Sequence, residues 1–159
     1  RGTIGGSLAH ADPAADWVSC LSVLGGHVIL VGEAGSRRLR VRDFVMGAFH
    51  TALGSDELVA AVWVPRLAAG SRFGYFKACR KTGELAHAIG AVFVDADDGT
   101  ERVVMGATGG RPVVLEGEGV ATGAGWEDAL RTTAAGLDTM DRRLHLETLQ
   151  RACELSETL

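Results

Sequence analysis

The sequence has little of what cross-links, metal clusters and membrane spans require. It contains only three cysteines in 159 residues, Cys20, Cys79 and Cys153, which are odd in number and far apart. Without a Cys-x-x-Cys pair they provide no disulfide framework, and they exclude an iron–sulfur cluster bound by four closely spaced thiolates. No apolar run reaches the length of about 18 residues that a membrane helix needs, and no signal peptide is present. The sequence therefore predicts a cytoplasmic protein that does not enter a membrane.

The polar residues also lack several functional patterns. The five histidines show no His-x-x-x-His spacing, so we expect no metal site. The formal net charge of −4 argues against nonspecific binding to nucleic acid. The basic run from Arg37 to Arg42 alternates with apolar residues, which is typical of a solvated strand edge. No Gly-x-Ser-x-Gly elbow of a hydrolase occurs, and the glycines from Gly117 to Gly125 match no phosphate loop and predict a flexible connection.

What is present is the pattern of an α+β chain, in which strands and helices come in blocks. With 47% hydrophobic residues, the chain is long enough for one large core or two small ones. The segment 66–70 follows Pro65 and contains small residues, so we expect two domains, residues 1–66 and 67–159. In the first domain we predict a helix at residues 14–24 and a hairpin of strands 27–31 and 37–41. A short helical turn with Phe49 inward follows at 43–49, and a strand at 58–64.

The second domain is predicted to hold a small antiparallel sheet followed by helices. Asp97-Asp98-Gly99 is a hairpin turn of the Asp-Gly type between two strands. The last helix has Leu144, Leu149 and Leu155 near helical spacing, with many charges opposite. The predicted elements are strands 71–79, 88–96 and 100–107 and helices 126–135 and 139–156.

A pair of glycines near the start is the most informative motif. Gly5 and Gly6 can take backbone angles closed to other residues and leave their N–H groups bare, so a phosphate can approach the main chain. Thr3 and Ser7 flank them with hydroxyl donors. The Asp12-Pro13 step predicts the N-cap and the first residue of a helix. By spacing alone, a Gly-Gly pair is most often a simple turn.

Two longer segments carry a family resemblance. Residues 3–16, TIGGSLAHADPAAD, resemble the second flavin-binding segment of the FAD-carrying medium subunit of molybdenum hydroxylases, the group that includes carbon monoxide dehydrogenase and xanthine dehydrogenase. Residues 75–86, YFKACRKTGELA, are similar to the family's Tyr-x-Lys-x-x-Arg-Lys-Thr-Gly-Asp-x-Ala signature, with Glu84 in place of the Asp. The motifs occur in the family's order and at about its distance. The resemblance covers essentially the whole chain and is strongest up to about Gly110.

The resemblance implies an oxidoreductase subunit. Electrons would pass from [2Fe-2S] clusters of a small subunit through FAD on this chain to an acceptor, while substrate is oxidised at a molybdenum cofactor in a large subunit. The expected assembly is a dimer of heterotrimers, and no residue of this chain is expected to be catalytic. The implied fold is the later part of the FAD-binding domain, followed by a small three-stranded sheet with C-terminal helices.

One part of the family pattern is missing from the sequence. Such subunits normally carry an earlier Ala-Gly-Gly segment, and this chain begins without Met inside what would be a continuous flavin domain. We therefore expect a piece of a longer protein. The alternative hypothesis is a noncatalytic module that has lost flavin binding and docks other subunits through an apolar helix face near Leu144 and Leu149.

The resemblance also implies which residues bind the cofactor. The glycine segment would contact the FAD pyrophosphate, Lys77 would lie near the flavin, and Tyr75 and Val59 would pack beside the ring. Ordinary surface or core roles stay open for these three side chains. Asp16 either presents a carboxylate to FAD or favours the helix dipole as a first-turn acid, and His10 is either a polar loop residue or an FAD contact. The implied cofactor-binding residues are Thr3, Ile4, Gly5, Gly6, Ser7, Asp12, Asp16, Val59, Tyr75 and Lys77.

Overall fold

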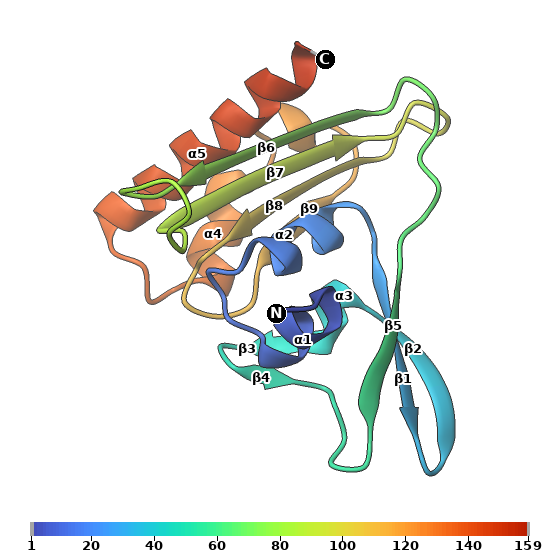
Figure 1. The fold of residues 1–159 in the computed structure, drawn as a ribbon. Coiled ribbons are helices and arrows are strands. Elements are labelled where there is room, and N and C mark those ends of the chain that lie inside the picture. Colours follow the sequence, from blue (N-terminus) through green and yellow to red (C-terminus); the bar gives the residue numbers. More distant parts are fainter. Residues whose placement is uncertain (1, 159) are drawn as a thin grey trace.

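A three-stranded antiparallel sheet organises the first part of the structure, a computed structural model that describes residues 2–158. Its strands are β1 (His27–Gly32), β2 (Gly35–Arg40) and β5 (Leu58–Trp63), in the order β2-β1-β5. The hairpin of β1 and β2 and the strand β5 confirm the prediction from apolar, β-branched runs and the turn between them. In Figure 1 this sheet extends away from the larger sheet of the second part.

Short helices flank this sheet and share its core. They are α1 (Ile4–His10), α2 (Asp16–Val23) and α3 (Val41–Phe44), and a two-stranded ribbon of β3 (Val45–Gly47) and β4 (His50–Thr51) follows α3. Burial of their apolar side chains together stabilises elements that are too short to be stable alone. The buried members of this core are Leu8, Ala11, Val18, Leu21, Val28, Leu30, Val41, Phe44 and Val45.

The predicted start of the first helix is wrong, because Asp12 closes a turn and does not cap a helix. Its Oδ1 accepts the N–H of Ala14 at 2.9 Å, as in an Asx turn. Helix α2 begins at Asp16, and its N-cap Ala15 makes no side-chain cap. The sequence pattern does not predict α1 at all, because two glycines in its first turn lower its helix propensity.

Phe49 is a second correction, since its ring is exposed and not in the core. The helical turn predicted over 43–49 ends at Phe44, and the chain continues as β3. Phe49 has φ 54° and is 63% exposed, and its N–H donates to the Ala11 carbonyl at 2.9 Å. The left-handed backbone that makes this hydrogen bond directs the side chain away from the core. The ring lies against His10, with centroids 5.1 Å apart.

A four-stranded antiparallel sheet forms the second part. Its strands β6 (Arg72–Ala78), β7 (Ala88–Val94), β8 (Glu101–Gly106) and β9 (Val113–Glu116) lie side by side in sequence order. The first three confirm the prediction. The fourth, β9, is missing from it, because four residues are too short a run for a clear period and its pairing with β8 is a tertiary contact.

Helices cover both faces of this larger sheet (Figure 1). Helix α5 (Thr139–Glu157) runs along one face against β6 and β7 with α4 (Trp126–Thr133) beside it, and α2 lies on the other face against β7 and β8. The contact of α2 joins the two parts of the chain. The connection 117–125 is more ordered than predicted, because it contains the 3-10 turn η1 (Val120–Thr122). The Val120 carbonyl accepts the Trp126 indole N–H at 2.5 Å.

The apolar positions of the C-terminal helix are only partly used in the core. Leu149 is fully buried against the sheet, and His145 on the same helix is buried as well, whereas Leu144 is half-buried and Leu155 is exposed. The His145 ring nitrogens both face backbone carbonyls, Nδ1 that of Asp141 at 2.8 Å and Nε2 that of Gly106 at 3.1 Å. Core packing therefore removes Leu149 from the docking face that the alternative hypothesis requires.

The cysteines and the other metal-ligating side chains form no cluster in the part of the chain that the structure describes. Cys20, Cys79 and Cys153 are free thiols, and no group of three His, Cys, Asp or Glu side chains within residues 2–158 is placed to hold a metal ion. Burial raises the pKa of the Cys20 and Cys153 thiols to about 11, so both stay protonated at neutral pH. Among the described helices, none is both long and apolar enough to cross a membrane.

An ion pair between the β1–β2 hairpin and the turn before β5 holds the Glu57 carboxylate in its ionised form. Arg37 Nε lies 2.6 Å from Glu57 Oε1, and the Gly54 N–H donates to Glu57 Oε2 at 2.7 Å. The Arg37 hydrogen bond, followed by that of Gly54, lowers the pKa of Glu57 from 4.5 to about 2. Because the folded state favours the ionised form, this contribution to stability is present above pH 4.5 and is lost as the pH falls through about 2.

We expect Arg37→Gln to return the pKa of Glu57 toward its ordinary value, because the variant removes the positive charge and the guanidinium hydrogen bonds that favour the carboxylate. An NMR titration of the Glu57 side-chain carboxyl carbon measures this. Arg38→Gln, at the next position of β2, is the control and should leave that pKa unchanged. An equal pKa in Arg37→Gln and the native protein would show that Gly54 alone sets it.

Candidate functional site

The two glycines lie in the first turn of helix α1 and not in a loop. Thr3 is the N-cap, and its Oγ1 accepts the Gly6 N–H at 3.0 Å while its carbonyl accepts the Ser7 N–H at 3.0 Å. Neither Gly5 nor Gly6 has a positive φ, so the expected need for unusual backbone angles is wrong. What these glycines provide is the absence of a side chain.

Helix α1 lies beside β5, with Gly5 next to Val59. A Cβ atom at Gly5 would be 3.4 Å from Val59 Cγ1, so the fold brings these two predicted residues together. Thr3, Ile4 and Gly6 stay exposed. The N–H groups in the first turn of a helix have no helical acceptor and form the positive end of the helix dipole. An anion can therefore reach this turn from solvent.

A second group of predicted residues meets where α2 faces β6. Asp16, the first residue of α2, accepts a hydrogen bond from the Tyr75 hydroxyl at Oδ1, and its Oδ2 lies 3.1 Å from Lys77 Nζ. Tyr75 and Lys77 are two residues apart on β6, so their side chains lie on the same face of the sheet. The Lys77 side chain is 21% exposed and that of Asp16 is 50% exposed. The cluster joins the two parts of the chain and keeps one side open.

This cluster changes the acidity of Tyr75. Burial, followed by the hydrogen bond to Asp16, raises the pKa of Tyr75 well above its ordinary value of 10.0. The folded chain holds the phenol proton more tightly than the unfolded chain, so this contribution to stability is present below pH 10.0 and is lost at higher pH. We expect Asp16→Asn to lower the Tyr75 pKa, because it removes a negative charge beside the phenol.

Tyr75 is the only tyrosine of the chain, so the NMR signal of its Cζ, followed through a pH titration, reports this change without overlap within the chain. Asp12→Asn is the matched control, since Asp12 holds its own turn and should leave the Tyr75 pKa as it is. A Tyr75 pKa that does not move in Asp16→Asn would show that burial alone sets it.

The structure thus gathers the predicted residues into two groups. The first is the glycine turn with Val59, and the second is the cluster of Asp16, Tyr75 and Lys77. Asp12 belongs to neither, because its side chain closes the turn between α1 and α2. Glu84, which departs from the family signature, pairs with Arg80 at 3.7 Å and not with either group.

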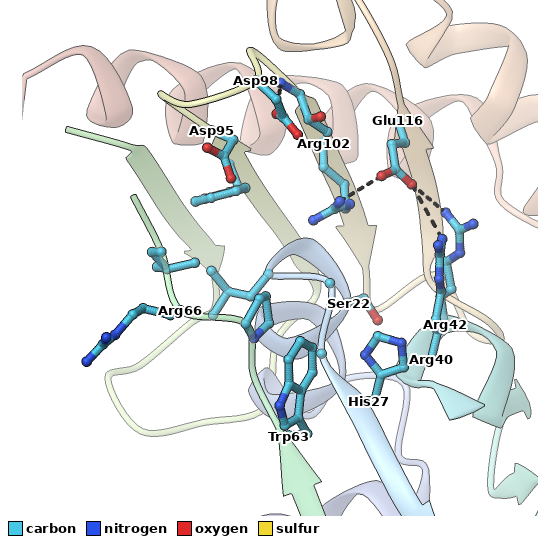
Figure 2. Close-up of a pocket in the computed structure, with 17 residues that line it drawn as sticks. Ser22, His27, Arg40, Arg42, Trp63, Arg66, Asp95, Asp98, Arg102 and Glu116 are labelled. Atoms are coloured by element: carbon cyan, nitrogen blue, oxygen red, sulfur yellow. Dashed lines mark hydrogen bonds and ion pairs between the residues drawn. The ribbon is translucent and has the colours of Figure 1, made fainter. Parts of the chain in front are cut away.

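A cleft of about 290 Å³ between the two sheets is lined by none of the ten predicted residues (Figure 2). The strand register places His27 between Arg40 on β2 and Trp63 on β5, so these three residues form a row along one wall. The opposite wall comes from the larger sheet. Further polar residues of the lining are Ser22, Arg42, Asp95, Asp98, Arg102 and Glu116.

One carboxylate at this cleft holds three guanidinium groups (Figure 2). A Glu116 oxygen lies 2.7 Å from Arg102 Nη2, and the other lies 3.0 Å from Arg42 Nη1 and 3.9 Å from Arg40 Nη1. The hydrogen bond from Arg102, with the nearby cations, lowers the pKa of Glu116. The alternating arginines predicted only a solvated strand edge, because the sequence does not show that this edge faces a second sheet.

Comparison with known proteins identifies the class to which these motifs belong. Residues 1–67 match the family described as FAD binding domain in molybdopterin dehydrogenase. The chain is 36% identical over 110 residues to the nicotine 6-hydroxylase medium subunit of Paenarthrobacter nicotinovorans. The aligned segment covers 69% of this chain and 38% of that protein. It is 37% identical over 98 residues to the carbon monoxide dehydrogenase medium chain of Afipia carboxidovorans. This aligned segment covers 62% of this chain and 34% of that protein.

The fold is shared as well. A chain of carbon monoxide dehydrogenase from Hydrogenophaga pseudoflava superposes with a TM-score of 0.81 at 27% identity, over 99% of this chain and 61% of that chain. Residues 1–67 therefore match the FAD-binding-domain family, and the chain is similar over most of its length to medium subunits or chains of these enzymes. This confirms the resemblance and the α+β fold. The chain matches 38% and 34% of the lengths of the two curated relatives and 61% of the superposed chain.

Proposed function

We propose that this chain is the FAD-binding part of a medium subunit in a molybdenum-containing hydroxylase or dehydrogenase. Electrons from [2Fe-2S] clusters of a small subunit pass through FAD to an acceptor, and substrate is oxidised at the molybdenum cofactor of a large subunit. The observation that carries the proposal is the family match over residues 1–67, which begins with the exposed glycine turn of α1. FAD supplies the redox chemistry, so the chain needs no nucleophile or general base of its own.

The glycine turn fits the charge and shape of the FAD pyrophosphate. The helix dipole and the N–H groups of the first turn stabilise negative charge at this end of α1. The Thr3 oxygen accepts the cap hydrogen bond, which leaves the hydroxyl hydrogen free to donate outward. The Gly6 N–H already donates to Thr3, but Gly6 is exposed and has no side chain, so a ligand can approach the main chain of this turn. We assign the pyrophosphate contacts to Thr3, Ile4, Gly5, Gly6 and Ser7, with Ile4 acting through its backbone.

The Asp16 cluster fits the polar and ring portions of the cofactor. Lys77 brings a cation to this face, and a cation near the flavin stabilises negative charge on the reduced ring. Asp16 holds Lys77 through Oδ2 and is half exposed, so it has lone pairs left to accept hydrogen bonds from cofactor hydroxyl groups. Tyr75 positions Asp16 and presents an aromatic ring, while Val59 offers an apolar contact beside Gly5. Asp12 acts indirectly by fixing the turn between the two groups.

The proposal includes the assembly. We assign residues 1–66 to the FAD-binding domain and residues 67–159 to the C-terminal domain of the medium subunit. The partners are a large subunit with the molybdenum cofactor and a small iron–sulfur subunit, in a dimer of heterotrimers located in the cytoplasm. The support for this step is that the curated relatives are medium subunits or chains by name.

Cofactor analysis of the native assembly tests this function. The assembly that contains this chain is purified, and its visible absorbance, released flavin, molybdenum and iron are measured in one preparation. We expect one FAD per copy of the chain, together with molybdenum and iron from the partner subunits. A flavin-free assembly with full molybdenum and iron content would contradict the proposal and leave a subunit without a redox role.

A further inference from the structure

The cleft between the two sheets is lined by charged residues of both signs. Arg40, Arg42 and Arg102 approach the carboxylate of Glu116, and Arg42 Nε also lies 4.0 Å from Asp43 Oδ1, so the arginines outnumber the carboxylates beside them. Asp95 and Asp98, at the turn between β7 and β8, line the cleft as well, and hydrogen bonds from Thr100, helped by the charge of Arg102, lower the pKa of Asp98. A fourth arginine, Arg66, also belongs to the lining, but its side chain extends away from the centre of the cleft in Figure 2.

Two residues that line this cleft carry buried polar atoms without hydrogen-bond partners among residues 2–158. Ser22 is only 3% exposed and lines the cleft, and its Oγ has no hydrogen-bond partner within the described residues. The Nδ1 atom of His27 is also buried without a partner. Burial, followed by the charges of Arg38 and Arg40, lowers the pKa of His27 and keeps the ring neutral at pH 7. An unpaired buried polar group is costly, so these two groups are poised to bond to a ligand.

Arg102 connects the charged residues of the cleft to the segment that holds Ser22. Its Nη1 donates to the Val23 carbonyl at 2.7 Å, next to Ser22 in the chain, while Nη2 binds Glu116. Arg40 is the register partner of His27 across β2 and β1. Guanidinium groups, a hydroxyl and a neutral imidazole therefore converge at one end of the cleft. Such a donor set matches the several acceptor oxygens of a phosphate group.

The two aspartates of the lining recognise a different chemistry. Asp95 and Asp98 each use Oδ1 to accept a backbone N–H of their own turn, from Asp97 at 2.9 Å and from Thr100 at 2.8 Å. The other oxygen of Asp95 can accept hydrogen bonds from hydroxyl groups. Trp63, in the row along the smaller sheet, is 42% exposed; Arg38 lies over its ring at 4.7 Å, and the rest of the indole offers an apolar surface to a sugar ring.

We propose that this cleft is a binding site for a sugar phosphate, with the phosphate against Arg40, Ser22 and His27 and the sugar hydroxyl groups toward Asp95 and Asp98. Its volume of about 290 Å³ is at the lower end of the range for small-molecule sites, which fits a ligand of this size. The site is separate from the residues assigned to FAD, none of which lines the cleft. The sugar phosphate proposal can therefore be tested independently of the flavin proposal.

Calorimetric titration of the native assembly with ribose 5-phosphate, at constant ionic strength, tests the site. We expect saturable binding of one molecule per copy of this chain, tighter than binding of inorganic phosphate or of ribose alone. Ser22→Ala and Arg40→Gln should each weaken it about tenfold or more, because each removes a hydrogen bond to a charged group. Neither variant should alter flavin content, since both residues lie outside the glycine turn and the Asp16 cluster.

Helix α2 supplies a matched control. Ser19 is fully buried on the same helix and its Oγ also has no partner, but it packs against Gly106 and does not line the cleft. Ser19→Ala should bind ribose 5-phosphate as the native protein does. Absence of saturable binding would overturn the proposal. Binding that Ser22→Ala and Arg40→Gln leave unchanged would also overturn it, because it would place the ligand elsewhere in the assembly.

Discussion

Replacing Gly90 by alanine is expected to lower the free energy of unfolding by about 3 kcal/mol, the upper end of the range for overpacking in a core. Gly90 lies in the middle of β7, where helix α5 crosses the larger sheet. A Cβ atom there would be 2.5 Å from Leu149 Cα and 2.6 Å from the Thr148 carbonyl oxygen. These are backbone atoms of a packed helix, so they cannot move aside as the end of a flexible side chain could. The helix must shift as a unit and leave gaps elsewhere.

Urea denaturation followed by circular dichroism measures this loss. Gly136→Ala is the control, because Gly136 is exposed between α4 and α5 and a Cβ there would have no atom within 4 Å. We expect that control to stay within about 0.5 kcal/mol of the native protein, or to gain slightly from a less flexible unfolded chain. Equal midpoints for Gly90→Ala and Gly136→Ala would show that α5 does not pack on β7 as closely as described.

Replacing Gly6 by aspartate is expected to remove most of the FAD from the native assembly, with an affinity loss of about a hundredfold. Gly6 lies in the exposed first turn of α1, where the proposed pyrophosphate contacts are made. The added carboxylate would face the two negative charges of the pyrophosphate, and a juxtaposition of like charges costs several kcal/mol. The fold itself should tolerate the change, because an acidic residue in the first turn favours the helix dipole.

Released-flavin analysis of the purified assembly measures the effect, and Gly6→Asn is its matched control. Asparagine has the same shape without the charge, and any side chain at this position starts 2.9 Å from Thr3 Oγ1, so both variants disturb the cap equally. We expect Gly6→Asn to retain clearly more flavin than Gly6→Asp. Full flavin content in Gly6→Asp would show that the glycine turn does not contact FAD and that the chain binds the cofactor through other residues.

The strands of this fold could largely be predicted from local sequence. The hairpin of β1 and β2 and the strands β6 to β8 follow from apolar runs separated by short turns, such as Asp97-Asp98-Gly99, and the structure confirms them. The failures have a common cause. Helix α1 and strand β9 have weak patterns of their own and are fixed by contacts with β5 and β8. Phe49 is turned outward by a hydrogen bond to Ala11, a residue that is distant in the sequence.

The candidate site could also be predicted only in part from the sequence. The family motifs single out Asp16, Tyr75 and Lys77 one by one, but the sequence does not show that they touch, since 59 and 61 residues separate Asp16 from the other two. Their contact depends on the packing of α2 on the larger sheet. The cleft with Ser22 and Arg40 could not be predicted, because its walls come from two sheets and its arginines have the pattern of an ordinary exposed strand.

The sequence by itself determined the family and the residue types that the proposed site requires, because the two motifs are contiguous and the chemistry of glycine, lysine and aspartate is intrinsic to each residue. It also determined the longer strands, because their apolar runs follow a local period, but not the short strands β3, β4 and β9. Only the tertiary structure decided that the glycines lie in a helix, that Asp12 holds a turn, and that Arg40 and Arg42 of the basic run approach Glu116 of a second sheet. These outcomes depend on burial and on hydrogen bonds between distant segments. Both contribute to the free energy of folding only when those segments are packed together.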